Sequence, residues 1–180
     1  LSAWGGLTVL LRWSFTSDAG TGGSLASPGW YVDDIQITNV ERPGPCVTRS
    51  PLAFYELAPC RVVDTRDPAG PLGGPALSPG VSVRTFPVTG TCGIPATAKA
   101  ISVNQTVTEA SAAGFIRVFA GDLTGALVPI TSAVSFPAGK TRANNGIVAL
   151  SRDGAGTIAV ENDAVGGTLH FILDVNGYFE

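Results

Sequence analysis

Lysine is scarce in this chain of 180 residues: it occurs only twice, as Lys99 and Lys140. Charged residues of both signs make up 14% of the sequence, about half the usual share. The formal net charge is −3, and no cluster of basic residues stands out. The chain therefore lacks the positive surface that binds nucleic acid or an anionic membrane, and we expect neither partner.

Long apolar runs are also missing. No segment approaches the roughly 18 apolar residues of a membrane-spanning helix, so we expect no membrane insertion. The opening stretch LSAWGGLTVLL is apolar but has no basic region before it, and we interpret it as a strand rather than a signal peptide. Methionine is absent. We therefore expect a processed product or a piece of a longer polypeptide.

Strong helix formers are few, with two Lys and five Glu, whereas Val, Ile, Thr and aromatic residues are plentiful. Gly contributes 23 residues and Pro 13, below the combined share of roughly 25–30% that is typical of disorder. Hydrophobic residues make up 44% of the chain, enough for a substantial core. This composition predicts an all-β protein.

Residues 1–40 contain two predicted strands. In TVLLRWSFT, residues 8–16, one face carries Val9, Leu11, Trp13 and Phe15, and the other is mostly polar. The second strand is WYVDDIQITNV, residues 30–40. Residues 41–52, ERPGPCVTRSPL, contain three prolines and no periodicity, and we interpret them as a linker. An isolated two-stranded hairpin is marginal in water, so these strands need a partner.

Residues 53–180 alternate between short strands and Gly- or Pro-rich turns, and no segment has a helical period. The pattern predicts an antiparallel sandwich, jelly roll or barrel. Pro87 should place its strand at a sheet edge or a bulge. The turns SRDGAG and NDAVGG predict β-hairpins. The eight predicted strands are YELAPCRVVDT, VSVRTFPVTG, AKAISVNQTVTE, GFIRVFAG, LVPITSAVSF, GIVALS, GTIAVEN and TLHFILDVNGYF.

Several motifs in this region occur in a fixed order: PCRVVDTRDPAGPLGGPAL, CGIPATAKAISVNQTV, KTRANNGIVAL and a terminal HFILDVNGYF. In these motifs, residues 54–179 resemble a β module of secreted and cell-surface proteins of bacteria. The resemblance implies a secreted or extracellular location at the cell surface. It also implies attachment to a larger protein, and it brings no defined catalytic role.

A second resemblance concerns residues 1–40. LRWSFTSD followed by GWYVDDIQIT is similar to the closing strands of the jelly-roll domains that accompany secreted bacterial metalloproteases. Those domains are several times longer, so the earlier strands are missing here. We therefore expect an N-terminal two-strand remnant of one jelly roll, a linker, and a β-sandwich or jelly-roll-like module from residue 53.

The acidic pair Asp33 and Asp34 raises the question of a metal. Jelly-roll modules of this kind often hold a structural calcium, so the second resemblance implies Asp33, Asp34 and Asp18 as candidate ligands. The alternative is structural: one carboxylate faces solvent, and the other caps a turn or pairs with an arginine. No further cofactor is expected.

The densest polar motif of the module is CRVVDTR, residues 60–66. One interpretation is a ligand site that uses Asp64, Thr65 and Arg66. The other, which we favour, is a strand end where Asp64 or Thr65 closes a turn and Arg66 pairs with a carboxylate, because Pro68 and Gly70 follow at once.

The chain has three cysteines, Cys46, Cys60 and Cys92, and no CxxC pair. With only one histidine, a zinc site is not expected. Cys60 and Cys92 both lie in the module, and we predict a disulfide between them, which indicates an oxidising compartment. Cys46 is then left to bond elsewhere in the parent protein or between subunits. The rival pairing is Cys46–Cys60.

The remaining candidates favour structural roles. His170 and Asp174 lie on one face of a predicted strand, about 13 Å apart, too far for a direct hydrogen bond. Asn104 opens the sequon NQT, but we interpret it as a strand residue. Trp30 and Tyr178 are candidate contacts for a glycan.

No catalytic constellation emerges, and we expect the chain not to be an enzyme. The favoured hypothesis is a non-catalytic extracellular structural module of a bacterial surface or secreted protein. It would form a homo-oligomer or filament by strand pairing between subunits. The alternative is a carbohydrate- or surface-binding accessory module behind a secreted hydrolase or protease.

Overall fold

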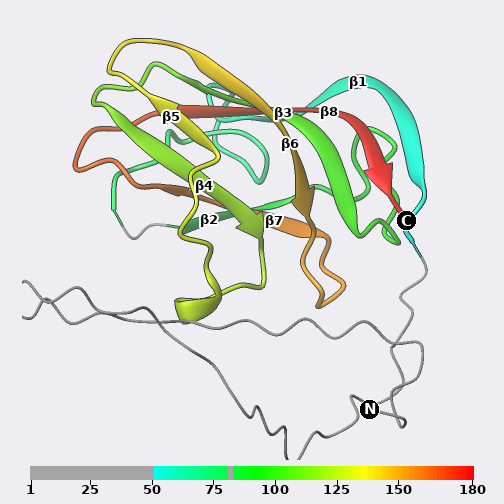
Figure 1. Ribbon diagram of the computed structural model, residues 1–180. Coiled ribbons are helices and arrows are strands. Elements are labelled where there is room, and N and C mark those ends of the chain that lie inside the picture. Colours follow the sequence, from blue (N-terminus) through cyan, green and yellow to red (C-terminus); the bar gives the residue numbers. More distant parts are fainter. Residues whose placement is uncertain (1–50, 81–82) are drawn as a thin grey trace, which may run out of the picture. The chain divides into compact units, whose positions relative to one another are not determined.

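The computed structural model describes residues 51–80 and 83–180 (Figure 1). Within these ranges the chain is all-β: it has eight strands, one short 3-10 helix and no α-helix. The strands are β1 (Phe54–Asp64), β2 (Val83–Pro87), β3 (Ala100–Thr108), β4 (Gly114–Ala120), β5 (Val134–Phe136), β6 (Arg142–Ala149), β7 (Thr157–Asn162) and β8 (His170–Phe179), and the 3-10 helix is η2 (Gly125–Leu127).

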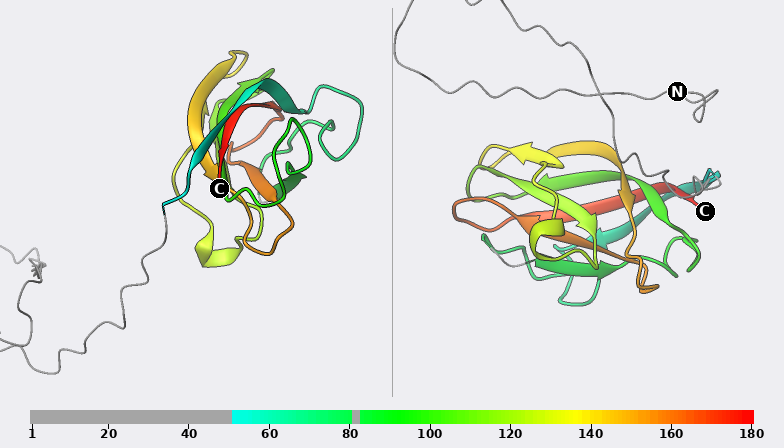
Figure 2. Two further views of the ribbon diagram at one scale, coloured as in Figure 1. Left: turned by 90° about the vertical axis from the view of Figure 1, so that its right-hand side faces the viewer. Right: turned by 60° about the horizontal axis from the view of Figure 1, so that its bottom comes forward.

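The strands form two four-stranded sheets, with the orders β1-β8-β3-β6 and β2-β7-β4-β5. Figure 2 shows these sheets stacked face to face. All pairings are antiparallel. The expected antiparallel sandwich is confirmed. The strands predicted in residues 1–40 lie outside the described residues.

The pairing is nested: β1 pairs with β8, β2 with β7, β3 with β6 and β4 with β5. Such nesting arises when a long antiparallel ribbon is rolled so that its strand pairs alternate between two sheets, which gives a jelly roll. The roll brings the two ends of the module together. The backbones of Ala53 and Glu180 exchange hydrogen bonds of 2.8 and 3.0 Å.

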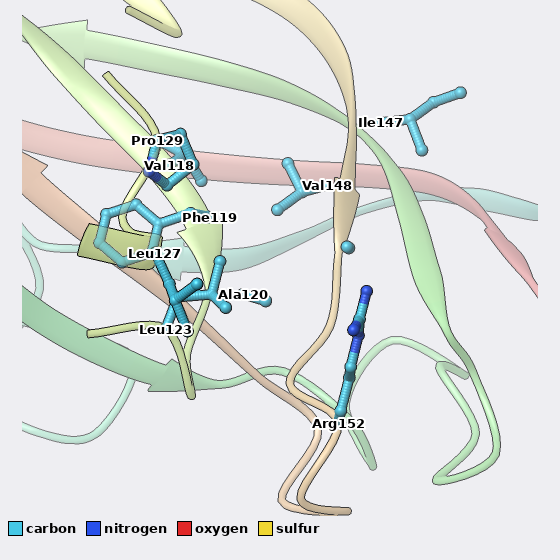
Figure 3. A pocket seen from close by; sticks show the side chains of 10 residues that line it. Val118, Phe119, Ala120, Leu123, Leu127, Pro129, Ile147, Val148 and Arg152 are labelled. Atoms are coloured by element: carbon cyan, nitrogen blue, oxygen red, sulfur yellow. The ribbon is translucent and has the colours of Figure 1, made fainter. Parts of the chain in front are cut away.

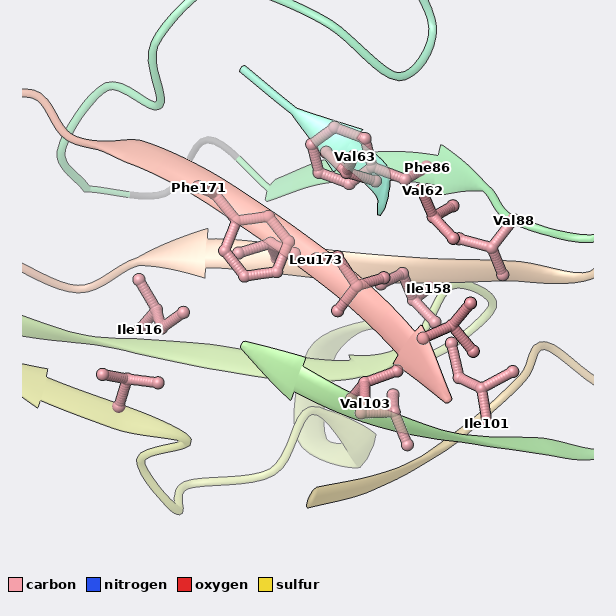
Figure 4. Packing of buried hydrophobic residues seen from close by; sticks show 14 of the residues in the cluster. Val62, Val63, Phe86, Val88, Ile101, Val103, Ile116, Ile158, Phe171 and Leu173 are labelled. Carbon is pink, nitrogen blue, oxygen red and sulfur yellow. The ribbon is translucent and has the colours of Figure 1, made fainter. Parts of the chain in front are cut away.

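Alternating apolar residues of both sheets fill the space between them (Figure 4). In β8, Phe171, Leu173 and Val175 are buried, the face that the alternation predicts. In β3 the same is true of Ile101, Val103 and Val107. These side chains are buried because the pleat turns every second residue toward the opposite sheet. The rings of Phe86 and Phe171 meet across the core, with centroids 6.0 Å apart.

Four local predictions need correction. The hairpins expected at SRDGAG and NDAVGG are wrong, because these turns join strands of different sheets. The strand expected over residues 127–136 is reduced to β5, which spans only Val134–Phe136. The strand expected at GIVALS begins earlier, at Arg142, because β6 continues its ladder with β3 through Asn144 and Asn145. Local patterns identify turns, but the sheet partner is decided by the whole fold.

One prediction about an edge is confirmed. β2 lies at the edge of its sheet and ends at Pro87. Proline has no N–H for a ladder, which suits an edge position. Among the described residues, no helix is long and apolar enough to cross a membrane.

Candidate functional site

The motif Asp64-Thr65-Arg66 ends β1 in a charged turn. Arg66 Nε donates to Asp64 Oδ1 at 2.9 Å, and Arg66 Nη2 donates to Oδ2 at 2.6 Å. The backbone N–H of Arg66 also donates to Oδ1, at 3.1 Å. The backbone N–H of Asp67 then bonds to the carbonyl oxygen of Asp64 at 3.1 Å, which closes the turn. The structure thus has the strand end that we favoured from the sequence, in which Asp64 closes a turn and Arg66 pairs with a carboxylate.

The neighbouring charges extend this cluster across the sheet. Arg61 Nη1 lies 3.3 Å from Asp64 Oδ2, and Arg61 Nε lies 2.8 Å from Asp174 Oδ1 on β8. The Asp64 side chain is 7% exposed. The hydrogen bond from Arg66 is the main cause that lowers the pKa of Asp64 to about 2, and it raises the pKa of Arg66. The cluster is a charge-compensated clasp between β1 and β8.

Thr65 and His170 form a second contact between these strands. Thr65 is buried. Its Oγ1 accepts a hydrogen bond from the N–H of Phe171 at 2.8 Å and lies 3.1 Å from His170 Nδ1. His170 therefore contacts Thr65, whereas Asp174 pairs with Arg61. Both carboxylate oxygens of Asp64 already accept hydrogen bonds within the module. A ligand contact at Asp64 or Arg66 stays a prediction of the sequence.

The predicted disulfide is confirmed: Cys60 and Cys92 are bonded, with Cα atoms 5.8 Å apart. Cys92 has a positive φ of 51° and lies in a turn after β2, so the bond joins β1 to that turn. Cys46 lies outside the described residues. Asn104, on β3, is half-buried, and its Nδ2 lies 3.4 Å from Thr106 Oγ1.

The calcium candidates Asp18, Asp33 and Asp34 lie outside the described residues, as does Trp30. Within residues 51–80 and 83–180, no three His, Cys, Asp or Glu side chains are grouped so that they could hold a metal ion. The calcium site stays a prediction of the sequence.

Tyr178, the other glycan candidate, stacks on Tyr55 where β1 and β8 meet. The ring centroids are 5.1 Å apart and the rings are 14° from parallel. Tyr178 also packs against the core, whereas Tyr55 is 46% exposed. Any stacking on a sugar at this point would therefore use Tyr55 more than Tyr178.

Arg84 has a role that the sequence did not reveal. Its Nη2 donates to the carbonyl oxygens of Gly70, Gly73 and Gly74 at 2.6–2.9 Å, and its Nη1 donates to Pro75 O at 2.7 Å. Its guanidinium carbon also lies 4.7 Å from the ring centroid of Phe86. Arg84 therefore holds the PLGGPAL loop with main-chain bonds. The only sequence signal was a single charged residue in an otherwise uncharged strand.

The sheet edges differ in how well they are protected from an added strand. β1 has two register shifts against β8, β2 ends in proline, and β5 has three residues. β6 has eight residues, no register shift against β3 and no proline. Its residues 143–149, ANNGIVA, carry no charge. Bulges, prolines, charges and short length are the usual protection of an edge, and β6 has none of them beyond Arg142 at its start.

A groove of about 450 Å³ runs between β6 and β4 (Figure 3). Its walls are residues 118–120 of β4, residues 147–149 of β6, and Leu123, Leu127, Pro129 and Arg152 of the adjoining loops. In Figure 3, Val148 points toward the β4 side, and Ile147 points away from it. Only one lining side chain is charged, so the groove is suited to an apolar occupant.

Sequence comparisons find no match: no protein-family model and no curated protein is similar to the chain. Among solved structures, the coat protein of Tobacco streak virus matches with a TM-score of 0.36 and 11% identity. The match covers 76% of this chain and 90% of the coat protein. A similarity of this degree carries no argument about function.

Proposed function

We propose that this chain is a non-catalytic, extracellular structural module of a bacterial surface or secreted protein, and that its copies assemble into a filament through strand pairing. The observation that carries the proposal is the unprotected edge of β6. A long, regular edge with its one charge at the start offers unpaired N–H and C=O groups to another strand, and proteins usually block such edges. An edge left open is suited to assembly.

The polar clusters of the module support a structural role. Asp64, Arg66, Arg61 and Asp174 bind one another and tie β1 to β8. Arg84 binds four main-chain carbonyl oxygens of one loop. The charged groups of these side chains bind other groups of the module and stabilise the fold. In a binding or catalytic site, such groups would instead face a ligand. The disulfide between Cys60 and Cys92 is compatible with an extracellular location.

Sedimentation velocity and negative-stain electron microscopy of the full chain test the proposal. We expect species larger than the monomer whose population rises with concentration, and filaments in the images. A Cys46→Ser variant separates strand pairing from a disulfide between subunits, and it should assemble as the parent does. A monomer over the whole concentration range would contradict the proposed assembly.

The second candidate is a carbohydrate-binding accessory module, favoured by the aromatic end of β1. Phe54 and Tyr55 are exposed there, beside Leu52 and the stacked ring of Tyr178. Exposed aromatic rings are suited to stacking on sugars. A glycan array with the parent and with Tyr55→Ala tests this: binding that the substitution removes supports it, and an array without binding excludes it.

A further inference from the structure

We propose that the edge of β6 and the groove beside it accept residues 8–16 of a second copy, which would join the sheet as a fifth strand. The inference rests on the proposed self-assembly and names both partners of the contact. The donor is TVLLRWSFT, which the sequence predicts to be a strand. The acceptor is the open edge of β6 with the groove beside it.

The backbone of β6 has its free groups at alternate residues. Leu150 N donates to Lys99 O at 2.9 Å, and β6 pairs with β3 without a shift. In an antiparallel ladder the bonded residues alternate, so the even-numbered residues of β6 bond to β3. The N–H and C=O groups of Ala143, Asn145, Ile147 and Ala149 therefore point toward the open edge. Four residues offer two groups each to an incoming strand.

The groove determines what kind of strand fits. A strand added to β6 places every second side chain on the side of Val148, which is buried and faces β4. Those opposite residues 147–149 would meet Val118, Leu123 and Leu127 and should therefore be apolar. The alternate side chains would lie on the side of Ile147, which is 66% exposed, and should be mainly polar.

Residues 8–16 have this pattern. Val9, Leu11, Trp13 and Phe15 would lie on the side of Val148, and Leu10, Arg12, Ser14 and Thr16 would lie on the exposed side. The segment has nine residues, and β6 has eight. Its one charge, Arg12, would lie on the outward face, so the donor brings no charge into the groove. The apolar face of the donor thus matches the apolar lining beside Val148.

Donor and acceptor are different surfaces of the chain, so the contact is head to tail. Each copy that donates residues 8–16 still offers its own β6 to the next copy. The contact can therefore repeat without closing, which gives an open filament. Direct pairing of two β6 edges would instead close a dimer. Docking of residues 8–16 on their own β6 would give a monomer. The oligomeric state of suitable variants separates these cases.

The test uses two damaged full-length chains. Leu11→Lys with Trp13→Lys puts charges on the groove side of the donor, and Ser14→Lys is the matched control on its other face. Asn145→Lys with Ile147→Lys puts charges on the acceptor edge, and Val83→Lys is the control on an exposed edge residue of the other sheet. We expect each double variant to lose all species above the monomer and each control to keep them. Ile147→Pro, which removes a free N–H but no bond to β3, repeats the acceptor test.

Mixing the two double variants is the decisive experiment. One chain keeps an intact acceptor and the other an intact donor, so the mixture should form one-to-one dimers and nothing larger. Assembly that survives the donor substitutions would overturn the inference in favour of β6 pairing with itself. Assembly that survives both double variants would overturn the inference and leave the proposed function standing. A monomeric parent chain would contradict both.

Discussion

The carboxylate of Asp64 forms a two-bond ion pair with the guanidinium of Arg66, two positions along the chain. The pair ends β1, and its carboxylate is almost completely buried. A buried carboxylate with a charged partner binds protons less readily in the folded chain than in the unfolded one. The stability of the module should therefore depend on pH in the acid range.

The first prediction concerns this dependence. The pKa of Asp64 falls from 3.8 to about 2 on folding, which corresponds to about 2 kcal/mol. A lowered pKa stabilises the fold at pH values well above 3.8, and this contribution is lost as the pH falls through about 2. Asp64→Asn should lower the free energy of unfolding by about 2 kcal/mol at neutral pH. Urea denaturation at a series of pH values should show the difference shrinking between pH 4 and pH 2, and a constant difference would contradict the assignment.

The second prediction concerns Arg84. Arg84→Met keeps the apolar stem but removes the donors to the loop carbonyl oxygens, so the free energy of unfolding should fall by about 2–3 kcal/mol. Hydrogen exchange should also rise in residues 70–75. Arg152→Met, at an exposed position, serves as the control and should change stability by less than about 0.5 kcal/mol. Equal effects of the two substitutions would refute the role of Arg84.

The third prediction compares two glycines of the same loop. A Cβ on Gly74 would lie 2.8 Å from the carbonyl oxygen of Asp67, a backbone atom that cannot turn aside. A Cβ on Gly70 would have only an ordinary contact, 3.9 Å from Pro68 O. Gly74→Ala should therefore destabilise the module clearly, whereas Gly70→Ala should be tolerated. Thermal melts of both variants check this, and a lower melting temperature for Gly70→Ala than for Gly74→Ala would be the wrong order.

The fourth prediction concerns the disulfide. Cys60 and Cys92 are 32 positions apart, and closing a loop of this size stabilises a fold by about 3–4 kcal/mol through the unfolded chain. The double substitution Cys60→Ala, Cys92→Ala should lower the free energy of unfolding by about this amount. Cys46→Ala is the matched control and should leave the stability of the module unchanged. Guanidinium denaturation under non-reducing conditions measures both.

Most strand positions could be predicted, β5 and the start of β6 excepted, because short-range patterns determine them. The alternation in ISVNQTV and HFILDV identified the buried faces of β3 and β8, since a pleated strand turns every second side chain to the same side. Pro87 indicated an edge strand for a similarly local reason. Proline has no backbone N–H, so it cannot donate a hydrogen bond to a neighbouring strand. The shared position of Cys60 and Cys92 in one module was enough to predict their bond.

The pairing of strands could not be predicted in the same way. SRDGAG and NDAVGG have the turn residues of hairpins, yet they carry the chain from one sheet to the other. Turn chemistry bends the backbone whether or not the two strands then pair, and the pairing depends on distant strands. The role of Arg84 and the clasp from Arg61 to Asp174 depend in turn on that pairing, which brings together residues far apart in the sequence.

The sequence by itself determined that this protein is all-β and which faces of β3 and β8 are buried, and it favoured the Cys60–Cys92 disulfide over its rival, because these follow from local periodicity and from residue chemistry. The tertiary structure decided which strands are neighbours, and therefore that β6 remains an unprotected edge beside an apolar groove. Whether an edge is open depends on what lies next to it in space. A strand's own residues can favour or oppose an added strand, but only the nested pairing of the roll determines that β6 has no neighbour on one side among residues 51–80 and 83–180.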